Sequence, residues 1–331
     1  MITKRRLLSL LASGPAALAL PAAWSQTAPA PHAWPTQPLK ILVGFPPGST
    51  PDLAARAIAD ALAKAIGQSV VIENRPGASG NIAADLLAKA QDQHTIGVLI
   101  NGNLTVAKLL NPSLSFDPAK DFAPLSLIGT APLLLTAAGS ATGGTPAELL
   151  QWARGLGTQA NYGTPGIGTV GHLGMELIKS KTGVAAVHVP FTGNPQVINA
   201  MLAGQIHLSL LPPGLALPHV KSGKLKAIGI TSPARSALVP DQPTLREAGV
   251  TGADLEIWTA AAAPATMPKA IVDKLGAALM EAIRSAESQQ RLLNAGWQAV
   301  GSTPEALAAR MKTDAGQLGE IIAARGIKLD S

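Results

Sequence analysis

Short apolar runs alternate along the chain with segments whose apolar residues recur at helical spacing. The apolar runs predict strands at residues 39–45, 69–73, 95–100, around 161, 186–189, 206–210 and 225–231. The segments with helical spacing predict helices at residues 52–66, 81–90, 169–181, 196–203, 269–284 and 304–325. Strands that alternate with helices favour parallel sheets covered by helices on both faces. The pattern therefore predicts an α/β protein.

Two longer apolar segments, residues 123–138 and 255–263, have the pattern of extended strands and divide the chain roughly into thirds. In one arrangement, residues 39–131 and 256–331 form one α/β domain, and residues 132–255 form a second domain inserted between them. The two segments are then paired crossover strands, with a hinge and a central cleft between two lobes. A single doubly wound sheet is the alternative, and the pattern alone leaves both open.

The N-terminus has the pattern of an export signal. Lys4-Arg5-Arg6 precedes an apolar run at residues 7–20, and Ala23-Trp24-Ser25 offers small residues at a cleavage site. A membrane anchor is the alternative, but it needs about 20 uninterrupted apolar residues, and this run is broken at its middle. We expect a signal peptide at residues 1–25, cleaved near Ser25, and an extended leader at residues 26–38. The two arginines leave general and twin-arginine export open.

Composition excludes several classes of function. Charged residues make up 14% of the chain, and 26 Lys and Arg against 20 Asp and Glu give a formal net charge of +6. The basic residues are scattered and aromatic residues are only 3%, so nucleic acid is not expected as a partner. The chain has no cysteine, which excludes disulfides, thiolate zinc sites and cysteine nucleophiles. The histidines show no metal-binding spacing, so we expect neither a metal nor another cofactor.

The first candidate for binding chemistry is the segment Phe45-Pro46-Pro47-Gly48-Ser49-Thr50-Pro51-Asp52, called the first loop below. A predicted strand ends there, and a helix begins with a proline at or near its first position. The free N–H groups of such a helix start, together with the helix dipole, form an anion site. Ser49 and Thr50 add hydroxyl donors, although an ordinary turn in which they only cap the helix is the alternative. Asp52 is expected to pair with Arg56 rather than to act as a catalytic acid.

A second candidate is residues 162–172, called the second loop below, in which Gly166, Gly168 and Gly171 match G-x-G-x-x-G. A dinucleotide site would also show an acid about 20 residues further on, at the end of the next strand. That strand ends in residues 188–193 without an Asp or Glu. We therefore interpret the second loop as another anion cradle, to which Thr164 and Thr169 add hydroxyls.

One anion site in each predicted lobe favours a small carboxylate held between two helix starts. Such a ligand stabilises the closed cleft and needs no covalent chemistry. The rival hypothesis is an exported enzyme in which His172 and Asp52 act as an acid–base pair across the cleft. A ligand-sensing partner of a membrane sensor is a third interpretation, because it would use the same site.

Together with other landmarks, these loops resemble those of the Bug-type periplasmic solute-binding receptors of tripartite tricarboxylate transporters. The resemblance covers nearly all of residues 35–331. Its further landmarks include Glu73-Asn74-Arg75-Pro76-Gly77-Ala78, Asp117-Pro118, His188-Val189-Pro190-Phe191, Pro240-Asp241 and Trp258.

This resemblance implies a two-lobed periplasmic-binding-protein fold of type II, the Venus flytrap, in which the two loops grip a ligand carboxylate, partly through bridging waters. It implies a periplasmic protein that delivers its ligand to a membrane permease; we expect a monomer. The residues expected to bind the ligand are Phe45, Pro47, Gly48, Ser49, Thr50, Asn101, Thr164, Gly166, Gly168, Thr169, Phe191, Thr192 and Leu211.

Three departures from the family pattern bear on the ligand. The first loop has Ser49 where a second glycine is usual, and the second loop has Thr164 and Thr169 where serine is common, which keeps the hydroxyls. Leu211 stands where many relatives carry an acid that could pair with a ligand amine or hydroxyl. The absence of this acid disfavours an amino-acid ligand and favours a carboxylate with an apolar or aromatic tail.

Overall fold

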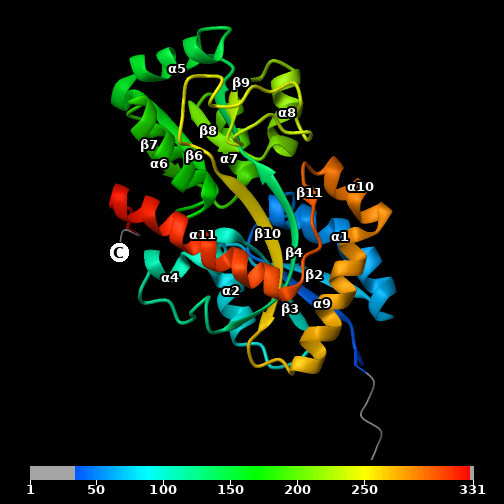
Figure 1. Cartoon of the computed structure of the whole chain (residues 1–331). Helices are drawn as coiled ribbons and strands as arrows, with labels where there is room; N and C mark the ends of the chain where they lie inside the picture. The colour runs from blue at the N-terminus through cyan, green and yellow to red at the C-terminus, as the bar shows by residue number, and fades with distance from the viewer. Residues whose placement is uncertain (1–33, 329–331) are drawn as a thin grey trace, which may run out of the picture. The chain divides into compact units, whose positions relative to one another are not determined.

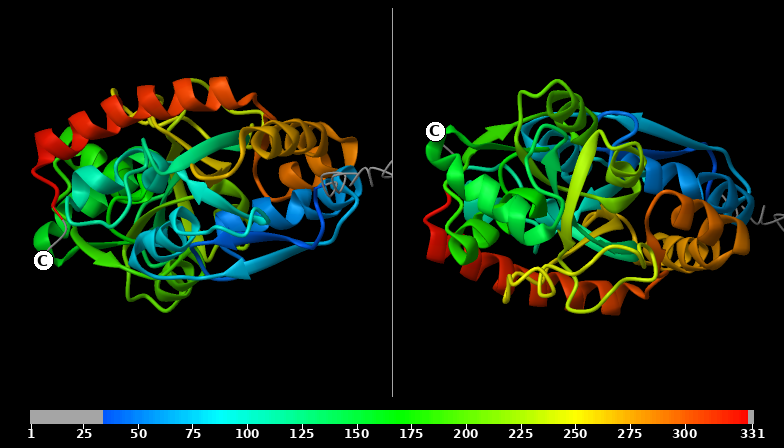
Figure 2. Two further views of the ribbon diagram at one scale, coloured as in Figure 1. Left: turned by 90° about the horizontal axis from the view of Figure 1, so that it is seen from below. Right: turned by 90° about the horizontal axis from the view of Figure 1, so that it is seen from above.

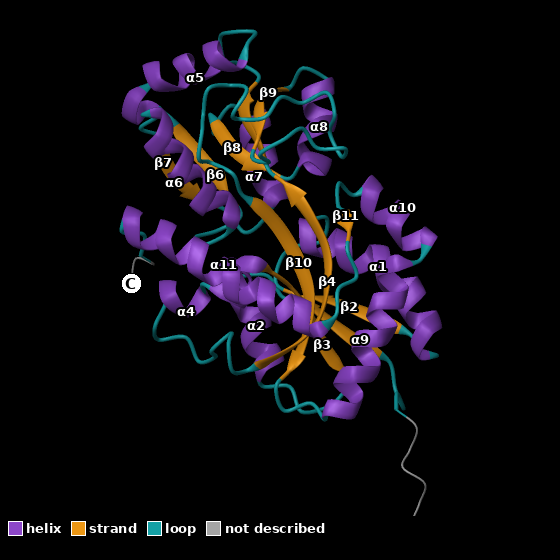
Figure 3. Cartoon of the chain, viewed as in Figure 1, coloured by secondary structure: helices purple, strands orange, loops and turns teal. Residues whose placement is uncertain are grey.

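The computed structural model describes residues 34–328, which belong to one compact unit. The expected signal peptide and most of the expected leader lie outside the described residues. Residues 34–328 form two β-sheets, each with its own helices, stacked along the long axis of this unit (Figures 1 and 3). The alternative of a single doubly wound sheet is therefore wrong. No helix in this part of the chain is both long enough and apolar enough to cross a bilayer.

The first lobe is built on a six-stranded sheet with the order β11-β4-β10-β3-β1-β2. Its strands are β1 (Leu39–Val43), β2 (Val70–Asn74), β3 (Thr95–Ile100), β4 (Phe122–Pro132), β10 (Glu256–Pro264) and β11 (Gln298–Ala299). Its helices are α1 (Thr50–Ile66), α2 (Asn81–Ala88), α3 (Asn101–Thr105), α4 (Ala107–Leu110), α9 (Lys269–Arg284), α10 (Ala286–Asn294) and α11 (Pro304–Arg325), with a 3₁₀ turn at Ala78–Gly80. Apolar residues of α1, α9 and α10 cover one face of the sheet, and those of α2, α3 and α11 cover the other.

The second lobe is built on a five-stranded sheet with the order β7-β6-β8-β5-β9. Its strands are β5 (Leu134–Ala138), β6 (Asn161–Thr164), β7 (Val187–Pro190), β8 (Leu208–Leu211) and β9 (Leu225–Ile230). Its helices are α5 (Pro146–Gly155), α6 (Val170–Thr182), α7 (Asn194–Leu202) and α8 (Pro213–Lys221), with a 3₁₀ turn at Gly157–Gln159. α5 and α6 pack on one face, while α7 and α8 enclose an apolar cluster on the other.

Both sheets are mixed, so the expectation of parallel sheets is wrong. β1 is parallel to β2 and β3, and β6 is parallel to β7 and β8. By contrast, β10 is antiparallel to β3 and β4, and β5 is antiparallel to β8 and β9. The reversed strands are the ones that pass between the lobes, where no helical crossover connects neighbouring strands. Parallel pairing needs such a crossover.

The predicted pair of crossover strands is confirmed. β4 and β10 pair antiparallel from Phe122 opposite Pro264 to Pro132 opposite Glu256. The predicted strand 123–138 is interrupted at Leu133, where β4 ends and β5 begins in the other sheet. The domain boundaries predicted after residues 131 and 255 fall at this place and stay a prediction.

Thr231, at the end of β9, joins both crossover segments. Its hydroxyl donates to the carbonyl of Leu255 (2.6 Å) and accepts the N–H of Leu133 (2.9 Å). Its own N–H donates to the Leu133 carbonyl, and the N–H of Leu255 donates to the Thr231 carbonyl. Thr231 therefore holds the two strands in register where they enter the second lobe.

α11 is the other element that reaches from one lobe to the other. It runs along the outside of both lobes in the views from below and above (Figure 2), and it packs against α3 and α6. Near its end, the guanidinium of Arg325 lies 3.7 Å from the carboxylate of Glu176 on α6. The C-terminal helix thus closes one side of the gap between the sheets.

Candidate functional site

The first loop is held by its own carboxylate. Gly48 has a left-handed backbone (φ +80°), and its N–H donates to the Asp52 carboxylate (2.9 Å). Arg56 and the side-chain amide of Asn74 donate to the same carboxylate. Burial alone would raise the pKa of Asp52, but the hydrogen bonds from Arg56, Gly48 and Asn74 outweigh it and hold that pKa below its ordinary value. Asp52 therefore fixes the turn.

Ser49 is left with an unused hydroxyl. It is the N-cap residue of α1, yet its side chain makes no capping hydrogen bond. The side chain is 1% exposed, and its Oγ has no hydrogen-bond partner among residues 34–328. A buried polar group in this state costs stability unless something else satisfies it. The hydroxyl of Ser49 is thus free to donate a hydrogen bond to a ligand.

The second loop uses its glycine amides internally. The N–H of Gly166 donates to the hydroxyl of Thr164 (3.2 Å), and the N–H of Gly168 donates to Nδ1 of His172 (3.2 Å). Thr169 caps α6 by accepting the N–H of His172, and its hydroxyl donates to the Gly166 carbonyl (2.7 Å). The amides left for an anion are therefore those of Val170 and Gly171, the first two residues of α6, which have no acceptor inside the helix.

A small cavity of about 50 Å³ lies between the two helix starts. α1 contributes Thr50 and Pro51 to its wall, and α6 contributes Val170 and Gly171. None of the 17 residues that line it is charged. An anion there would be held by amides and hydroxyls at two positive helix ends.

The two lobes touch around this cavity. The side-chain amide of Asn194, at the start of α7, donates to the Thr50 hydroxyl (2.8 Å). A Cβ added to Gly193 would lie 2.9 Å from Ser49 Oγ, and one added to Gly102 would lie 2.8 Å from the carbonyl oxygen of Gly168. The structure is therefore a closed form, in which the two loops face each other.

The structure brings five of the predicted site residues to the cavity wall: Phe45, Ser49, Thr50, Asn101 and Thr169.

The other predicted residues lie elsewhere. Gly48, Thr164, Gly166 and Gly168 shape the loops through the hydrogen bonds described above, while Pro47 and Thr192 are exposed. Phe191 and Leu211 pack in the apolar cluster beneath α7 and α8. The strand position beside Leu211 explains the difference, because Leu210 points to the cavity and successive side chains alternate between faces.

Sequence reasoning missed five wall residues with polar groups or free amides: Val170, Gly171, Asn194, Trp258 and Trp297. Val170 and Gly171 follow the second loop directly, so the rule about helix starts could have found them. Asn194 opens a helix after a strand, which is the same signal in weaker form. Trp297 had no local signal, because only the fold carries it to the cavity.

The histidines form a separate cluster behind the second loop. The rings of His172 and His188 stack with centroids 4.2 Å apart, and Tyr162 stacks on His188. Burial lowers the pKa of His172 to about 4 and that of His188 to about 3. Both rings are therefore neutral at pH 7, and neither lines the cavity. The pair proposed in the enzyme hypothesis is not assembled there, since Asp52 is occupied by Arg56, Asn74 and Gly48.

The sequence of this chain matches one receptor family. A family model described as the tripartite tricarboxylate transporter family receptor matches residues 54–327. The chain belongs to this receptor family. It is 31% identical over 277 residues to BugT of Bordetella pertussis, across 82% of this chain and 84% of that one. The resemblance to Bug-type receptors is confirmed, and the enzyme hypothesis is wrong because the family consists of solute-binding receptors.

Solved structures agree with the receptor over nearly its whole described length. The periplasmic binding protein BugD has a TM-score of 0.84 at 29% identity, covering 89% of this chain and 99% of that one. MatC from Rhodopseudomonas palustris with bound malate has a TM-score of 0.82 at 31% identity, covering 87% and 100%. Another R. palustris protein, solved with adipate, has a TM-score of 0.83 at 31% identity, covering 89% and 99%. The expected two-lobed periplasmic-binding-protein fold is thereby confirmed.

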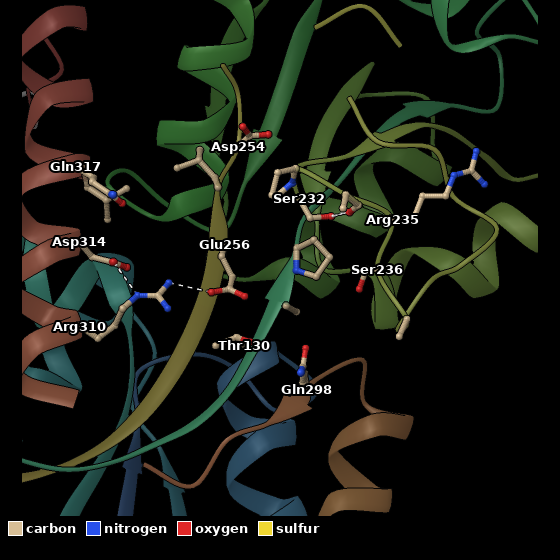
Figure 4. Close-up of a pocket in the computed structure, with 17 residues that line it drawn as sticks. Thr130, Ser232, Arg235, Ser236, Asp254, Glu256, Gln298, Arg310, Asp314 and Gln317 are labelled. Atoms are coloured by element: carbon tan, nitrogen blue, oxygen red, sulfur yellow. Dashed lines mark hydrogen bonds and ion pairs between the residues drawn. The ribbon is translucent and has the colours of Figure 1, made fainter. Parts of the chain in front are cut away.

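The receptor has a larger hollow of about 510 Å³ where the crossover strands leave the first lobe (Figure 4). Arg310 of α11 donates to Glu256 (2.9 Å) and Asp314 (2.8 Å), and Arg235 extends away from this group. Arg235 pairs with Glu247, so the charges at this hollow already have partners. The smaller cavity, with its unsatisfied donors, is the stronger candidate for a ligand.

Across residues 34–328, no cluster of three His, Cys, Asp or Glu side chains has metal-binding geometry.

Proposed function

We propose that the receptor binds a small carboxylate in the cavity between the starts of α1 and α6. The observation that carries this proposal is the buried hydroxyl of Ser49, which has no partner among residues 34–328 and lies at a wall free of charged side chains. The first-turn amides of Val170 and Gly171 lie on the opposite wall. A single carboxylate group can accept hydrogen bonds from both walls at once.

The energetics support an anion. Burying a carboxylate is costly unless it is hydrogen-bonded. Each hydrogen bond to a charged group contributes roughly 1.5–3 kcal/mol. Four or five bonds from the two loops reach the roughly −8 kcal/mol of a micromolar ligand before ordering costs are subtracted. Because the donors belong to separate lobes, the ligand binds the closed form better than the open one and shifts the population towards it.

Two relatives support the carboxylate class. MatC was solved with malate and the other R. palustris protein with adipate, and both ligands are carboxylates. By this analogy the receptor works in the periplasm, after export by a signal peptide cleaved near Ser25, and hands its ligand to a membrane permease of the tripartite type as a monomer. A membrane sensor is the alternative recipient.

Calorimetry on ligand-stripped protein tests the binding step. We expect saturable binding of at least one member of a panel of mono-, di- and tricarboxylates, and loss of about tenfold in affinity in Ser49→Ala. Because Ser49 makes no capping hydrogen bond, this change should leave α1 intact. Ser180→Ala, at an exposed position near the other end of α6, is the matched control and should bind normally. Binding of no carboxylate in the panel would overturn the proposal.

A further inference from the structure

Trp297 is the second residue of the cavity wall that carries an unsatisfied donor. Its side chain is 1% exposed and lines the cavity, and its Nε1 has no hydrogen-bond partner within the described chain. Trp258 lines the same cavity, but its Nε1 donates to the carboxylate of Asp314 (2.5 Å). The indole N–H can only donate. Of the two tryptophans at this wall, Trp297 alone therefore needs an acceptor from the ligand.

The position of Trp297 is fixed in the closed form. Its backbone N–H donates to the carbonyl of Leu292 (2.8 Å), and its Cβ lies against Gly129 of β4, where an added methyl group would be only 3.3 Å away. The preceding residues, Ala295 and Gly296, touch the backbone of Gly214 on α8 in the second lobe. Trp297 thus sits next to a contact between the lobes, and the closed form holds its donor in place.

The rest of the wall limits what the ligand can carry. Apolar side chains such as Phe45, Leu133, Leu210 and Ile257 line it, and no Lys, Arg, Asp or Glu does. A second carboxylate would be buried without a cation, and an ammonium group would be buried without an anion, and both are costly. A neutral oxygen that accepts one hydrogen bond carries neither cost.

Size sets the final limit. A cavity needs roughly 10–15 Å³ to hold each water molecule. The cavity of about 50 Å³ therefore has room for about four waters. The closed form therefore accepts a short ligand. This argues against the aromatic or long apolar tail that the loss of an acid at Leu211 favoured.

From the unsatisfied indole and the uncharged wall, we propose that Trp297 Nε1 donates a hydrogen bond to a neutral oxygen of the ligand, so that the receptor selects a short monocarboxylate with one keto or hydroxyl group over dicarboxylates and amino acids. This inference rests on the proposed function, since it assumes that a carboxylate occupies the helix starts.

The ligand comparison uses unbranched monocarboxylates of three to six carbons, their 2-oxo and 4-oxo derivatives, the matching 2-amino acids, and dicarboxylates of the same length. In the native receptor we expect the best keto acid to bind about tenfold tighter than its parent acid, because the parent leaves the indole N–H unsatisfied. The dicarboxylate and the amino acid should bind more weakly than the keto acid. If a parent acid or a dicarboxylate binds at least as tightly as the best keto acid, the inference is overturned, while the proposed function stays intact.

The variants Trp297→Phe and Trp152→Phe separate the role of the donor at the cavity from a general effect of losing an indole. In Trp297→Phe the roughly tenfold keto preference should disappear, whereas Trp152→Phe, on α5 and away from the cavity, should keep it. Nuclear magnetic resonance gives a second readout that does not depend on a variant's stability. The Nε1–H signal of Trp297 should shift when the keto acid binds, and that of Trp152, which does not line the cavity, should stay. An unchanged Trp297 signal with saturating keto acid contradicts the inference, and no binding by any carboxylate overturns the proposed function beneath it.

Discussion

The side-chain amide of Asn194 donates a hydrogen bond to the hydroxyl of Thr50 over 2.8 Å, and both residues are 6% exposed. Asn194 begins α7 in the second lobe, and Thr50 begins α1 in the first. Both line the small cavity. This bond can exist only when the lobes are closed, so it links ligand binding to closure.

Asn194→Ala should therefore weaken ligand binding about fivefold, which corresponds to about 1 kcal/mol, the usual net value of one hydrogen bond. Asn199→Ala, at an exposed position on the same helix, is the control and should bind normally. Calorimetry with the best carboxylate measures both. Equal affinities for the two variants would show that the Asn194 bond does not contribute to closure.

Gly193 lies where the lobes come closest to Ser49. Its backbone is extended (φ −178°), so alanine fits it without strain, but the new Cβ would lie 2.9 Å from Ser49 Oγ and 3.0 Å from Cδ of Pro46. Both neighbours belong to the other lobe. Gly193→Ala should thus hinder closure and reduce affinity more than tenfold, while the free energy of unfolding of the ligand-free protein stays nearly constant.

Gly155→Ala is the control for this change, because a Cβ there meets no atom within 4 Å. Small-angle X-ray scattering with and without ligand would report the closure directly. Native affinity and native compaction in Gly193→Ala would contradict the closed geometry described here.

The hinge prediction concerns Thr231. Thr231→Val removes the hydroxyl that accepts from Leu133 and donates to Leu255, and leaves two backbone groups of the crossover segments without partners. An unsatisfied buried group costs about 1–3 kcal/mol, so for the two groups we expect a loss of about 2–6 kcal/mol in the free energy of unfolding. Urea denaturation measures it, with the exposed Thr313→Val as control. A loss below about 0.5 kcal/mol would mean that Thr231 does not hold the hinge.

The buried histidines predict how stability depends on pH. The folded protein keeps His172 and His188 neutral down to pKa values of about 4 and about 3, because His172 is buried and the half-buried His188 is partly desolvated and stacks on it. In the unfolded chain they take up protons near the ordinary value of about 6.5. Between these pH values the unfolded state binds more protons, so stability falls as the pH drops from about 6.5 to 4. Above about pH 6.5 the two histidines cause no further change in stability.

The groups that face the two histidines include Tyr162, Glu176 and Lys179, and the Tyr162 hydroxyl and the Lys179 ammonium both donate to Glu176 (2.6 Å each). For His172 alone, this lowered pKa corresponds to a loss of about 3 kcal/mol in the free energy of unfolding between pH 7 and pH 4. Urea midpoints at several pH values measure it. His172→Asn keeps an acceptor for the Gly168 amide and should flatten the pH dependence, whereas His219→Asn on α8 should not. An equally steep dependence in His172→Asn would exclude this origin.

Much of the fold follows from periodicity. The predicted helices correspond to α1, α2, α6, α7, α9 and α11 within a few residues, because each has a clear apolar face. α8 was missed because its prolines, Pro213 and Pro218, hide a helix that the sheet supports. α5 begins with a capping box formed by Thr145 and Glu148, a signal present in the sequence and overlooked.

The sequence could not predict the direction of each strand within its sheet, nor which distant segments lie close together. Strand polarity depends on where the chain enters each sheet, so the antiparallel placement of β5 and β10 had no local signature. The loops were located correctly between strands and helices, but which amides stay free depends on hydrogen bonds such as that from Gly168 to His172. The approach of Trp297 to the cavity joins residues far apart in the chain, which no single segment encodes.

The central claim is that one carboxylate group sits between the starts of α1 and α6. A crystal structure of the receptor with the best-binding carboxylate tests it most directly. We expect carboxylate oxygens within hydrogen-bond distance of Ser49 Oγ and of the N–H groups of Val170 or Gly171, with the Asn194–Thr50 bond intact. A ligand found instead in the hollow beside Arg310 and Glu256, or with its carboxylate turned away from both helix starts, would contradict the account.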